Sequence, residues 1–386
     1  MNKKDFDEKV FHDTKLLLEH YRDVVWSLEV ETFQTSLNFQ KEYGTTLEDF
    51  LDQHHISGEL RGILCSICSC HGTPPEEISF ANHARIHYGL SHDPLRLVNG
   101  GDAVVKAFLQ QADKLNITII RNTTIQAWGG LEKPGKIYSA VLTNGESVEF
   151  ENLIFTQHPQ EILKMLPPEK VKEEFRQRVK SFSDSCGFYT WYGVLDESVT
   201  LEEDELCSCL SSANLNKILS GEHLEERTTG FVLSREVKSD GTPCSSVTIF
   251  QSVFPDETRE FAASSLNDRP EGYKLYKQEK DREIESLLYE IYPEFRNKVK
   301  HLCSSSLLTF RDYLKSSGSA YGVRQKIGQA NLFGRLPVRN FYTASQSSIL
   351  PGAVGSMLTA LVLFRKLAGE EAYKNALAVV QEGGVK

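Results

Sequence analysis

Residues 340–367, NFYTASQSSILPGAVGSMLTALVLFRKL, predict a strand, a tight turn and a helix in direct succession. Two aromatic residues favour a strand at the start, Pro351 and Gly352 close a turn of small residues, and residues 353–367 favour a helix. The first turn of such a helix presents unpaired backbone N–H groups, and small side chains allow an anionic group to approach them. Many helices follow Pro-Gly without binding anything, so the stretch alone leaves both interpretations open.

The length and composition of the chain indicate two domains with substantial cores. The chain has 386 residues, of which 40% are hydrophobic, and this length exceeds that of one ordinary domain. Its formal net charge of -10 is spread along the sequence without an acidic tail. A general nucleic-acid surface is therefore not expected.

Export and membrane-spanning signals are absent from the sequence. The N-terminal residues MNKKDFDEKVFHD contain no apolar core, and the best apolar run, 357–363, is followed by Arg365 and Lys366. The eight cysteines have no regular spacing, as expected for free thiols in a reducing compartment. We therefore expect a cytoplasmic protein. An apolar helical face within residues 47–90 leaves peripheral docking on a membrane open.

The first quarter of the chain predicts a layer of helices rather than a nucleotide-binding fold. Thr46, with Asp49 three residues later, resembles a capping box at the start of one of them. The expected helices cover residues 6–28, 33–40, 47–54, 58–70 and 79–88.

The following segment changes to a Gly-Gly pair, a helix and three strands. Gly100 and Gly101 precede a helix expected over 102–115, and Asn144-Gly145 predicts a hairpin with a type I′ turn. The last strand ends just before His158, where open α/β sheets bind ligands. The strands are expected at residues 117–121, 137–142 and 148–155.

Residues 160–309 predict an α+β region. Helices are expected at 169–182 and 274–292, and strands at 188–195, 230–236, 246–253 and 307–310. The pair Cys207 and Cys209 is expected in a loop. Aromatic residues at 188–192 favour a core strand over a substrate pocket. A long Gly/Ser-rich loop is expected over 314–331.

A group of cysteines and histidines offers a metal-site interpretation. Cys65 and Cys68 have C-x-x-C spacing, His71 follows them, and His83 and His87 share one helical face. Cysteine is equally at home as a small apolar residue inside a helix, and this structural interpretation is favoured. The sequence contains no G-x-S-x-G, P-loop or H-E-x-x-H motif, which argues against the corresponding hydrolases.

Taken together, the motifs of this chain resemble one enzyme family. The order of Gly-Gly, helix, strand, hairpin and strand over 97–158 is followed by SGSAYG at 317–322 and the strand, turn and helix of 340–367. This order is similar to that of the phytoene desaturase, carotenoid isomerase and all-trans-retinol 13,14-reductase family of FAD-dependent oxidoreductases. The resemblance extends over residues 47–367 and depends on the order and spacing of the motifs.

The resemblance implies an α/β fold with an α+β part, in which an incomplete FAD-binding domain is interleaved with a substrate domain. The FAD-binding domain would be Rossmann-like, of the amine-oxidase or phytoene-desaturase type. The implied division is a helical part of the substrate domain at 1–96, an FAD-domain segment at 97–160, the substrate domain at 161–310, a second FAD-domain segment at 311–372 and a tail at 373–386.

The resemblance also implies positions for the FAD cofactor. Gly100 and Gly101 would lie near the flavin, and Thr124 and Ile125 would lie at the adenine end. No catalytic residue and no metal ligand is assigned. The last motif, which covers the pyrophosphate and the isoalloxazine in the family, falls on Gln346, Pro351, Gly352, Gly355, Ser356 and Met357.

Two departures from the family pattern affect this expectation. The chain has no G-x-G-x-x-G, and Met1 falls where the family is already past its first βαβ unit. A separate chain carrying that unit is therefore an expected partner, because the chain alone would lack most pyrophosphate and ribose contacts and would expose a sheet edge. In the last motif, Ala344 replaces a glycine, and its methyl group is expected to crowd a bound phosphate.

Two functional hypotheses stay open from the sequence. The first is an FAD-dependent oxidoreductase acting on a polyene or another hydrophobic isoprenoid, with redox-neutral isomerisation of a polyene as a close variant. The second is a cofactor-free remnant that binds a hydrophobic ligand or a protein partner.

Overall fold

The computed structural model describes residues 44–91, 97, 100–132, 135–223, 225–238, 241–314 and 317–382. The helices expected at 6–28 and 33–40 lie outside these residues.

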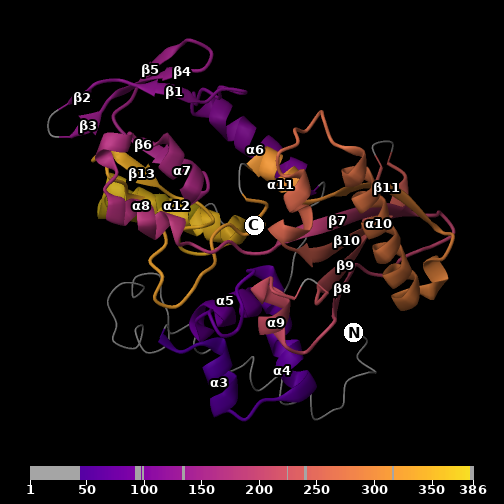
Figure 1. The fold of residues 1–386 in the computed structure, drawn as a ribbon. Coiled ribbons are helices and arrows are strands. Elements are labelled where there is room, and N and C mark those ends of the chain that lie inside the picture. Colours follow the sequence, from indigo (N-terminus) through magenta and orange to yellow (C-terminus); the bar gives the residue numbers. More distant parts are fainter. Residues whose placement is uncertain are drawn as a thin grey trace.

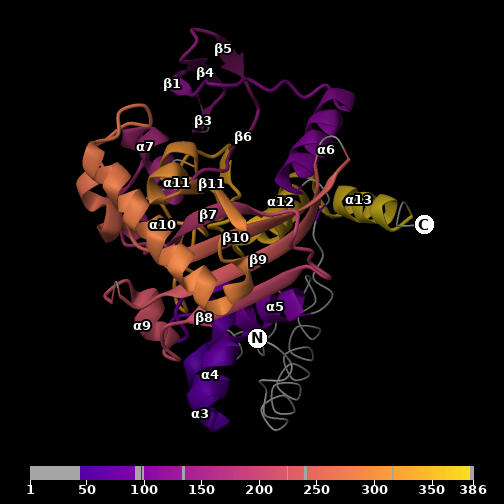
Figure 2. The same ribbon diagram turned by 90° about the vertical axis from the view of Figure 1, so that its right-hand side faces the viewer.

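A five-stranded antiparallel sheet forms the largest layer of the molecule. The long helix α10 (Glu271–Ile291) crosses one of its faces (Figure 2). Alternate side chains along the strands point to this helix, so Trp191, Ile249 and Leu288 are fully buried between the two. The strand order is β11 (Val299–Ser305), β7 (Gly187–Leu195), β10 (Pro243–Val253), β9 (Thr228–Val237) and β8 (Glu205–Leu210).

A second, smaller sheet contains the strand predicted near the C-terminus. β13 (Phe341–Thr343) pairs in parallel with β6 (Leu153–Phe155) and antiparallel with β12 (Gly334–Arg335). Phe155 and Phe341 are buried in an aromatic and aliphatic cluster, close to α7 (Pro159–Met165), α8 (Glu173–Lys180) and α12 (Gly352–Ala368) (Figure 1). Segments that are about 190 residues apart in sequence therefore share one sheet.

A small three-stranded sheet stands apart from these layers (Figure 2). It contains the predicted hairpin, and its strands are β1 (Ile125–Trp128), β4 (Ser139–Leu142) and β5 (Ser147–Glu149), with β2 (Leu131–Glu132) and β3 (Lys136–Ile137) beside it. The predicted type I′ turn is wrong, because only Gly145 of the Asn-Gly pair has a positive φ, of 87°. A turn closed by the bond from the Gly145 N–H to Leu142 O fits a three-residue loop instead.

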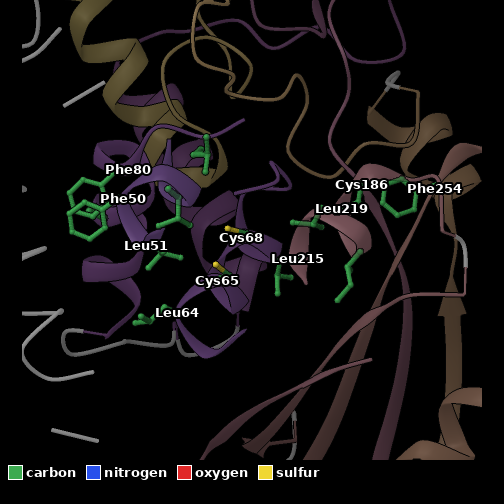
Figure 3. Close-up of a cluster of buried hydrophobic side chains, with 14 of the residues drawn as sticks. Phe50, Leu51, Leu64, Cys65, Cys68, Phe80, Cys186, Leu215, Leu219 and Phe254 are labelled. Carbon is green, nitrogen blue, oxygen red and sulfur yellow. The ribbon is translucent and has the colours of Figure 1, made fainter. Parts of the chain in front are cut away.

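The helices of residues 44–91 pack beneath the large sheet. They are α3 (Leu47–Gln53), α4 (Gly58–Cys65), the 3-10 helix η3 (Ser66–Cys70) and α5 (Phe80–Ser91), and α9 (Leu215–Ser220) joins them. Their apolar side chains meet in one core, which Figure 3 shows. The apolar face on which membrane docking would depend is therefore buried. The Thr46 cap is confirmed, because its Oγ1 accepts the Asp49 N–H at 2.9 Å.

Helix α6 (Gly100–Lys114) has few partners in the structure. All fifteen of its residues are described, and of these Ala112 alone is buried. Exposed apolar side chains continue into the extended segment that follows it. They are Val105, Phe108, Leu109, Leu115, Ile117, Ile119 and Ile120.

Several predicted elements differ from the observed ones. Residues 117–121 are extended but unpaired, residues 307–310 begin helix α11 (Leu307–Leu314), and the real edge strand β11 ends just before them. Cys207 and Cys209 lie in β8 rather than in a loop. The tail includes helix α13 (Glu370–Glu382). None of the described helices has the length and apolar character needed to cross a membrane.

Candidate functional site

The carboxyl ends of β6 and β13 meet at one edge of the small parallel pair. The Ala344 N–H donates to Phe155 O at 3.0 Å, so the two strands stay together up to this edge. In open α/β sheets the loops beyond this edge form the ligand crevice. The chain leaves β13 here and turns into α12, as the sequence predicted.

A serine-rich turn connects β13 to α12 and is fixed by its own hydroxyl groups. The Ser345 N–H donates to Ser348 Oγ at 3.0 Å, and the Ser347 N–H donates to Ser345 Oγ at 3.2 Å. Ser347 and Ser348 are buried. The turn is therefore a rigid connection rather than a loose loop.

The Gly/Ser-rich loop expected at 314–331 packs directly against this turn. The Val323 N–H donates to Ser347 Oγ at 3.2 Å, and a Cβ built on Gly322 would lie 2.1 Å from the same oxygen. Gly322 also has a φ of 71°, which glycine adopts without strain. Only a glycine allows the two segments to approach this closely.

The first turn of α12 is open to its surroundings. A Cβ built on Gly352, whose φ is 79°, would meet nothing within 4 Å, and Pro351 provides no side-chain cap. The Ser356 hydroxyl donates to Gly352 O and the Thr359 hydroxyl to Gly355 O, so both turn back onto their own helix. The N–H groups of this turn are therefore available to an external acceptor.

Two buried polar atoms at the same sheet edge have no hydrogen-bond partner among the described residues. They are Thr343 Oγ1, at the last position of β13, and Gln157 Oε1, two residues after β6. Leaving a buried polar atom unpaired costs about 1–3 kcal/mol, so such atoms in a native protein call for an explanation. A bound polar ligand at this edge would satisfy them.

His158 joins three parts of the chain behind the edge. Its Nδ1 accepts the Gln160 N–H at 3.3 Å at the start of α7, so Nε2 carries the proton and donates to Asp184 Oδ1 at 2.9 Å. The other Asp184 oxygen accepts from the Ser317 hydroxyl. The buried His158 therefore positions Asp184 and, through Ser317, the Gly/Ser-rich loop of residues 317–331, which we call the strap loop.

The structure groups some of the predicted cofactor residues and separates others. Gln346 lies in the serine turn, with its Cγ 3.6 Å from a Cβ built on Gly322. Gly100 and Gly101 are exposed at the start of α6. The Thr124 N–H donates a hydrogen bond to Thr143 Oγ1, beside the hairpin sheet. The start of α12 contains the remaining residues of the last motif, which are Pro351, Gly352, Gly355, Ser356 and Met357. Ile125 lies elsewhere, at the start of β1.

The expectation that Ala344 crowds a phosphate is not supported. Ala344 is 8% exposed and belongs to a buried cluster with Tyr342 and Leu363, which places it in the packing beneath α12. The unpaired hydroxyl of Thr343 was missed from the sequence, because only the fold shows which strand-end side chains are buried without a partner.

The residues present fit the part of FAD that the C-terminal motif would hold. The open first turn of α12 suits a pyrophosphate, and the unpaired atoms Thr343 Oγ1 and Gln157 Oε1 at the ends of β13 and β6 suit a polar group. The opposite half of such a site, a strand followed by G-x-G-x-x-G and a helix, has no counterpart in this sequence.

The face of the large sheet opposite α10 carries uncharged side chains along its central strands. Tyr189 and Trp191 point to α10 and form core, as the sequence favoured, whereas Phe188 and Tyr192 point away. Tyr192 is 38% exposed. The side chains on this face of β7 and β10 are Phe188, Thr190, Tyr192, Val194, Ser246, Thr248, Phe250 and Ser252.

No family model and no curated protein matches this sequence. Its structure, however, resembles solved oxidoreductases. A triple mutant of putrescine oxidase, from a redesign of its cofactor binding, matches with a TM-score of 0.63 and 11% identity over 97% of this chain and 76% of that chain. The wild-type enzyme bound to putrescine matches with a TM-score of 0.61 and 12% identity, over 97% of this chain and 77% of that chain. An oxidoreductase from Methanosarcina mazei matches with a TM-score of 0.51 and 13% identity, over 89% of this chain and 72% of that chain.

At these identities the likeness shows the fold alone. The predicted α/β fold with an α+β part is confirmed, and it is the fold of FAD-dependent oxidoreductases of the amine-oxidase type.

Proposed function

We propose that this chain forms the substrate-binding part and the C-terminal half of the cofactor site of an FAD-dependent oxidoreductase. The observation that carries the proposal is the carboxyl edge of β6 and β13, where the chain enters the open N-terminus of α12 and where two buried polar atoms have no partner among the described residues. FAD, when bound, supplies hydride transfer in such enzymes, and the protein provides binding and orientation.

The residues of this chain would hold the cofactor mainly through backbone groups. The first N–H groups of α12 would donate to phosphate oxygens, and Gly352 would let them approach. The rigid serine turn fixes the direction from which α12 begins. Gln346 and Met357, at the two ends of this segment, are proposed to border the flavin. Gly100, Gly101, Thr124 and Ile125 are proposed contacts on the resemblance alone.

A dinucleotide-binding unit is the proposed partner that completes the site. β6 has no neighbour on its outer side among the described strands, and Ile154 in it is 46% exposed. An open strand edge is a template for another strand, and a row of exposed apolar side chains marks an interaction surface. The apolar side chains of α6 and of the segment after it extend this surface.

A hydrophobic, uncharged substrate such as a polyene or another isoprenoid is the proposed substrate class. The support is the sheet face around Tyr192, because none of the described side chains of β7 and β10 on that face is charged. A diamine such as putrescine would need anionic or cation-binding groups there.

The cofactor proposal is tested by titrating the full chain with FAD and following the quenching of flavin fluorescence. Gly352→Asp places a carboxylate at the open helix start and should weaken binding by about tenfold or more, equivalent to about 1.4 kcal/mol. Gly145→Asp is the matched control, because Gly145 also has a positive φ and open space around its Cβ.

Equal affinity of the two variants for FAD would contradict the proposal. The substrate class is tested separately by binding of retinol, a fluorescent polyene. Tyr192→Ala should weaken it severalfold and Tyr313→Ala, at a 69% exposed position, should leave it unchanged. Preferential binding of putrescine would overturn the hydrophobic class.

A further inference from the structure

One buried cysteine and two buried histidines converge in the helical layer. Cys68 lies in η3, His71 follows it directly, and His83 lies in α5. The Cys68 Sγ and one ring nitrogen of each histidine all lie within 4.8 Å of one another. This cluster is remote in sequence from the residues proposed for the cofactor and does not depend on that proposal.

Two of the three distances between these atoms are those of ligands around one small cation. Cys68 Sγ lies 3.6 Å from His83 Nδ1, and His71 Nε2 lies 3.2 Å from the same atom. With Zn–S of about 2.3 Å and Zn–N of about 2.0 Å, a tetrahedral site has S···N edges of about 3.5 Å and N···N edges of about 3.3 Å. Both observed edges agree with these values within about 0.1 Å.

The protein already orients His83 as a ligand. Its Nε2 lies 3.1 Å from Leu64 O, and because a carbonyl can only accept, Nε2 carries the proton. The lone pair of Nδ1 therefore points to Cys68 and His71. A ring N–H donated to a backbone carbonyl is the usual outer contact of a metal-binding histidine.

The buried surroundings favour a neutral site. His71 and His83 are at most 1% exposed, so an uncompensated charge at this place would be costly. Cys65 is buried in the same core and lies beside Cys68 in Figure 3. Its thiol is not among the three mutually close ligand atoms, so its side chain would rotate towards the cation on loading. Two thiolates and two neutral imidazoles would balance the charge of a divalent cation inside this apolar cluster.

We propose that Cys68, His71 and His83 form a structural zinc site, in which the Cys65 side chain rotates inwards on loading to become the fourth ligand. Its spacing is C-x₂-C-x₂-H-x₁₁-H, and the site would join α4 and η3 to α5. All four groups come from the protein, so the site has no open position for a catalytic water, which is the pattern of a structural zinc site.

Loading changes the hydrogen bonds in a defined way. Without metal, His71 Nδ1 accepts the Thr73 N–H at 3.3 Å, so its Nε2 proton points to His83 Nδ1. With Nε2 bound to zinc, that proton moves to Nδ1 and the Thr73 amide loses its acceptor. Each cysteine releases one proton to solvent. Amide exchange at Thr73 therefore reports loading directly.

The Thr73 side chain links this site to the rest of the fold. Its Oγ1 accepts the Gln325 N–H at 3.2 Å, and Gln325 belongs to the strap loop that packs on the serine turn. Zinc bound in the helical layer would thus restrict the segment that supports α12.

The test is metal analysis of the full chain after chelation, dialysis and reloading with zinc, together with the absorption spectrum of the cobalt-substituted protein. We expect about one zinc per chain, and for Co²⁺ a tetrahedral ligand-field spectrum with a thiolate charge-transfer band. Cys68→Ser and His83→Gln should each lower zinc affinity at least 100-fold. Cys186→Ser, at an equally buried cysteine of the same core, should retain the metal.

The cobalt spectrum uses the wild-type chain, so the proposal stays testable even if a ligand variant fails to fold. Absence of bound zinc in the reloaded wild type, an octahedral cobalt spectrum without a thiolate band, or unchanged exchange at the Thr73 amide on loading would each overturn it.

Discussion

At the scale of single residues, glycines mark the places where two backbones touch. Gly355 lies in the first turns of α12, and a Cβ built there would be 2.3 Å from Leu350 O and 2.5 Å from its carbonyl carbon. The sequence identified this glycine as a cofactor position, but the structure also gives it a packing role. Substitutions at Gly355 therefore test packing before they test binding.

We predict that Gly355→Ala lowers the free energy of unfolding by about 1–3 kcal/mol, because the added methyl group must displace main-chain atoms. Gly101→Ala is the matched control, since Gly101 is also helical but a Cβ there meets nothing within 4 Å. The control should be neutral or stabilising by up to about 1 kcal/mol. Urea unfolding followed by circular dichroism measures both, and equal effects would refute the packing explanation.

A second prediction concerns Asn340, which is 1% exposed before β13. Its Nδ2 donates to Ile137 O at 2.7 Å and to Glu151 O at 2.9 Å, and its Oδ1 accepts the Ile137 N–H at 3.1 Å. Asn340→Ala leaves these backbone groups unpaired and should cost about 3 kcal/mol. Asn144→Ala, in the exposed hairpin turn, should cost less than about 1 kcal/mol. Chemical denaturation measures the free energy of unfolding of both variants, and an equal loss in the two would contradict the structural role of Asn340.

At the scale of elements, a polar network fastens α10 to the large sheet. Lys280 Nζ donates to Gln251 Oε1 at 3.2 Å and to Glu283 Oε2 at 3.0 Å, and Gln251 Nε2 donates to Glu283 Oε1 at 3.1 Å. Burial acts to raise the pKa of Glu283, but the Lys280 ammonium and the hydrogen bonds from Lys280 and Gln251 outweigh it, so the pKa lies below its ordinary value.

This shift predicts how stability changes with pH. A lowered folded pKa means that ionised Glu283 stabilises the protein above its unfolded pKa, near 4.5, and that this contribution is lost as the pH falls through the lower folded value. Glu283→Gln should therefore reduce the fall in Tm between about pH 6 and pH 3. Glu279→Gln, on the exposed side of α10, should keep the wild-type profile. A wild-type profile in Glu283→Gln would contradict the prediction.

Elements were predictable where local pattern and tertiary packing agree. The sequences of β7 and β10 carry aromatic residues or alternate between apolar and polar residues. The predicted bounds of these strands, and those of helices α10 and α12, lie within a few residues of the observed ones. β11 was missed because VKHLCSS lacks a clear apolar period, and it is held by its pairing with β7. The apolar residues 307–310 are compatible with a strand or a helix. In the structure they belong to helix α11, which packs against β7.

At the scale of the whole molecule, Arg324 in the strap loop connects three layers. It is 9% exposed, and its guanidinium donates to Leu219 O at 2.7 Å in α9, to Asp184 O at 3.0 Å and to Glu77 Oε2 at 3.3 Å. The planar fork of arginine serves acceptors in several directions at once. The strap loop therefore connects the helical layer to the carboxyl edge of β6 and β13.

We predict that Arg324→Ala lowers the free energy of unfolding by about 3–5 kcal/mol, because it leaves buried carbonyls without their donor and removes one of the two cations that pair with Glu77. Arg324→Lys should recover little, since an ammonium cannot reach all the acceptors. Arg259→Ala, which breaks an exposed pair with Asp256, should change stability by less than about 1 kcal/mol. Guanidinium denaturation measures the series, and full rescue by lysine would disprove the fork role.

The sequence by itself determined those elements whose signals are local. The turn at Pro351 and Gly352, the helix after it, the hairpin at Asn144-Gly145 and the cap at Thr46 are local, because each depends on residues only a few positions apart. The order of these motifs also determined the fold class, which the likeness to solved oxidoreductases confirms.

Only the tertiary structure decided which of these pieces meet. Phe155 and Thr343 pair across 188 residues, Gly322 fits beneath Ser347, and His71 and His83 converge on Cys68. Such contacts depend on chain topology and close packing, which no local pattern encodes. For the same reason, only the pairing of β6 with β13 puts the end of β6 and the turn that leads into α12 at one sheet edge.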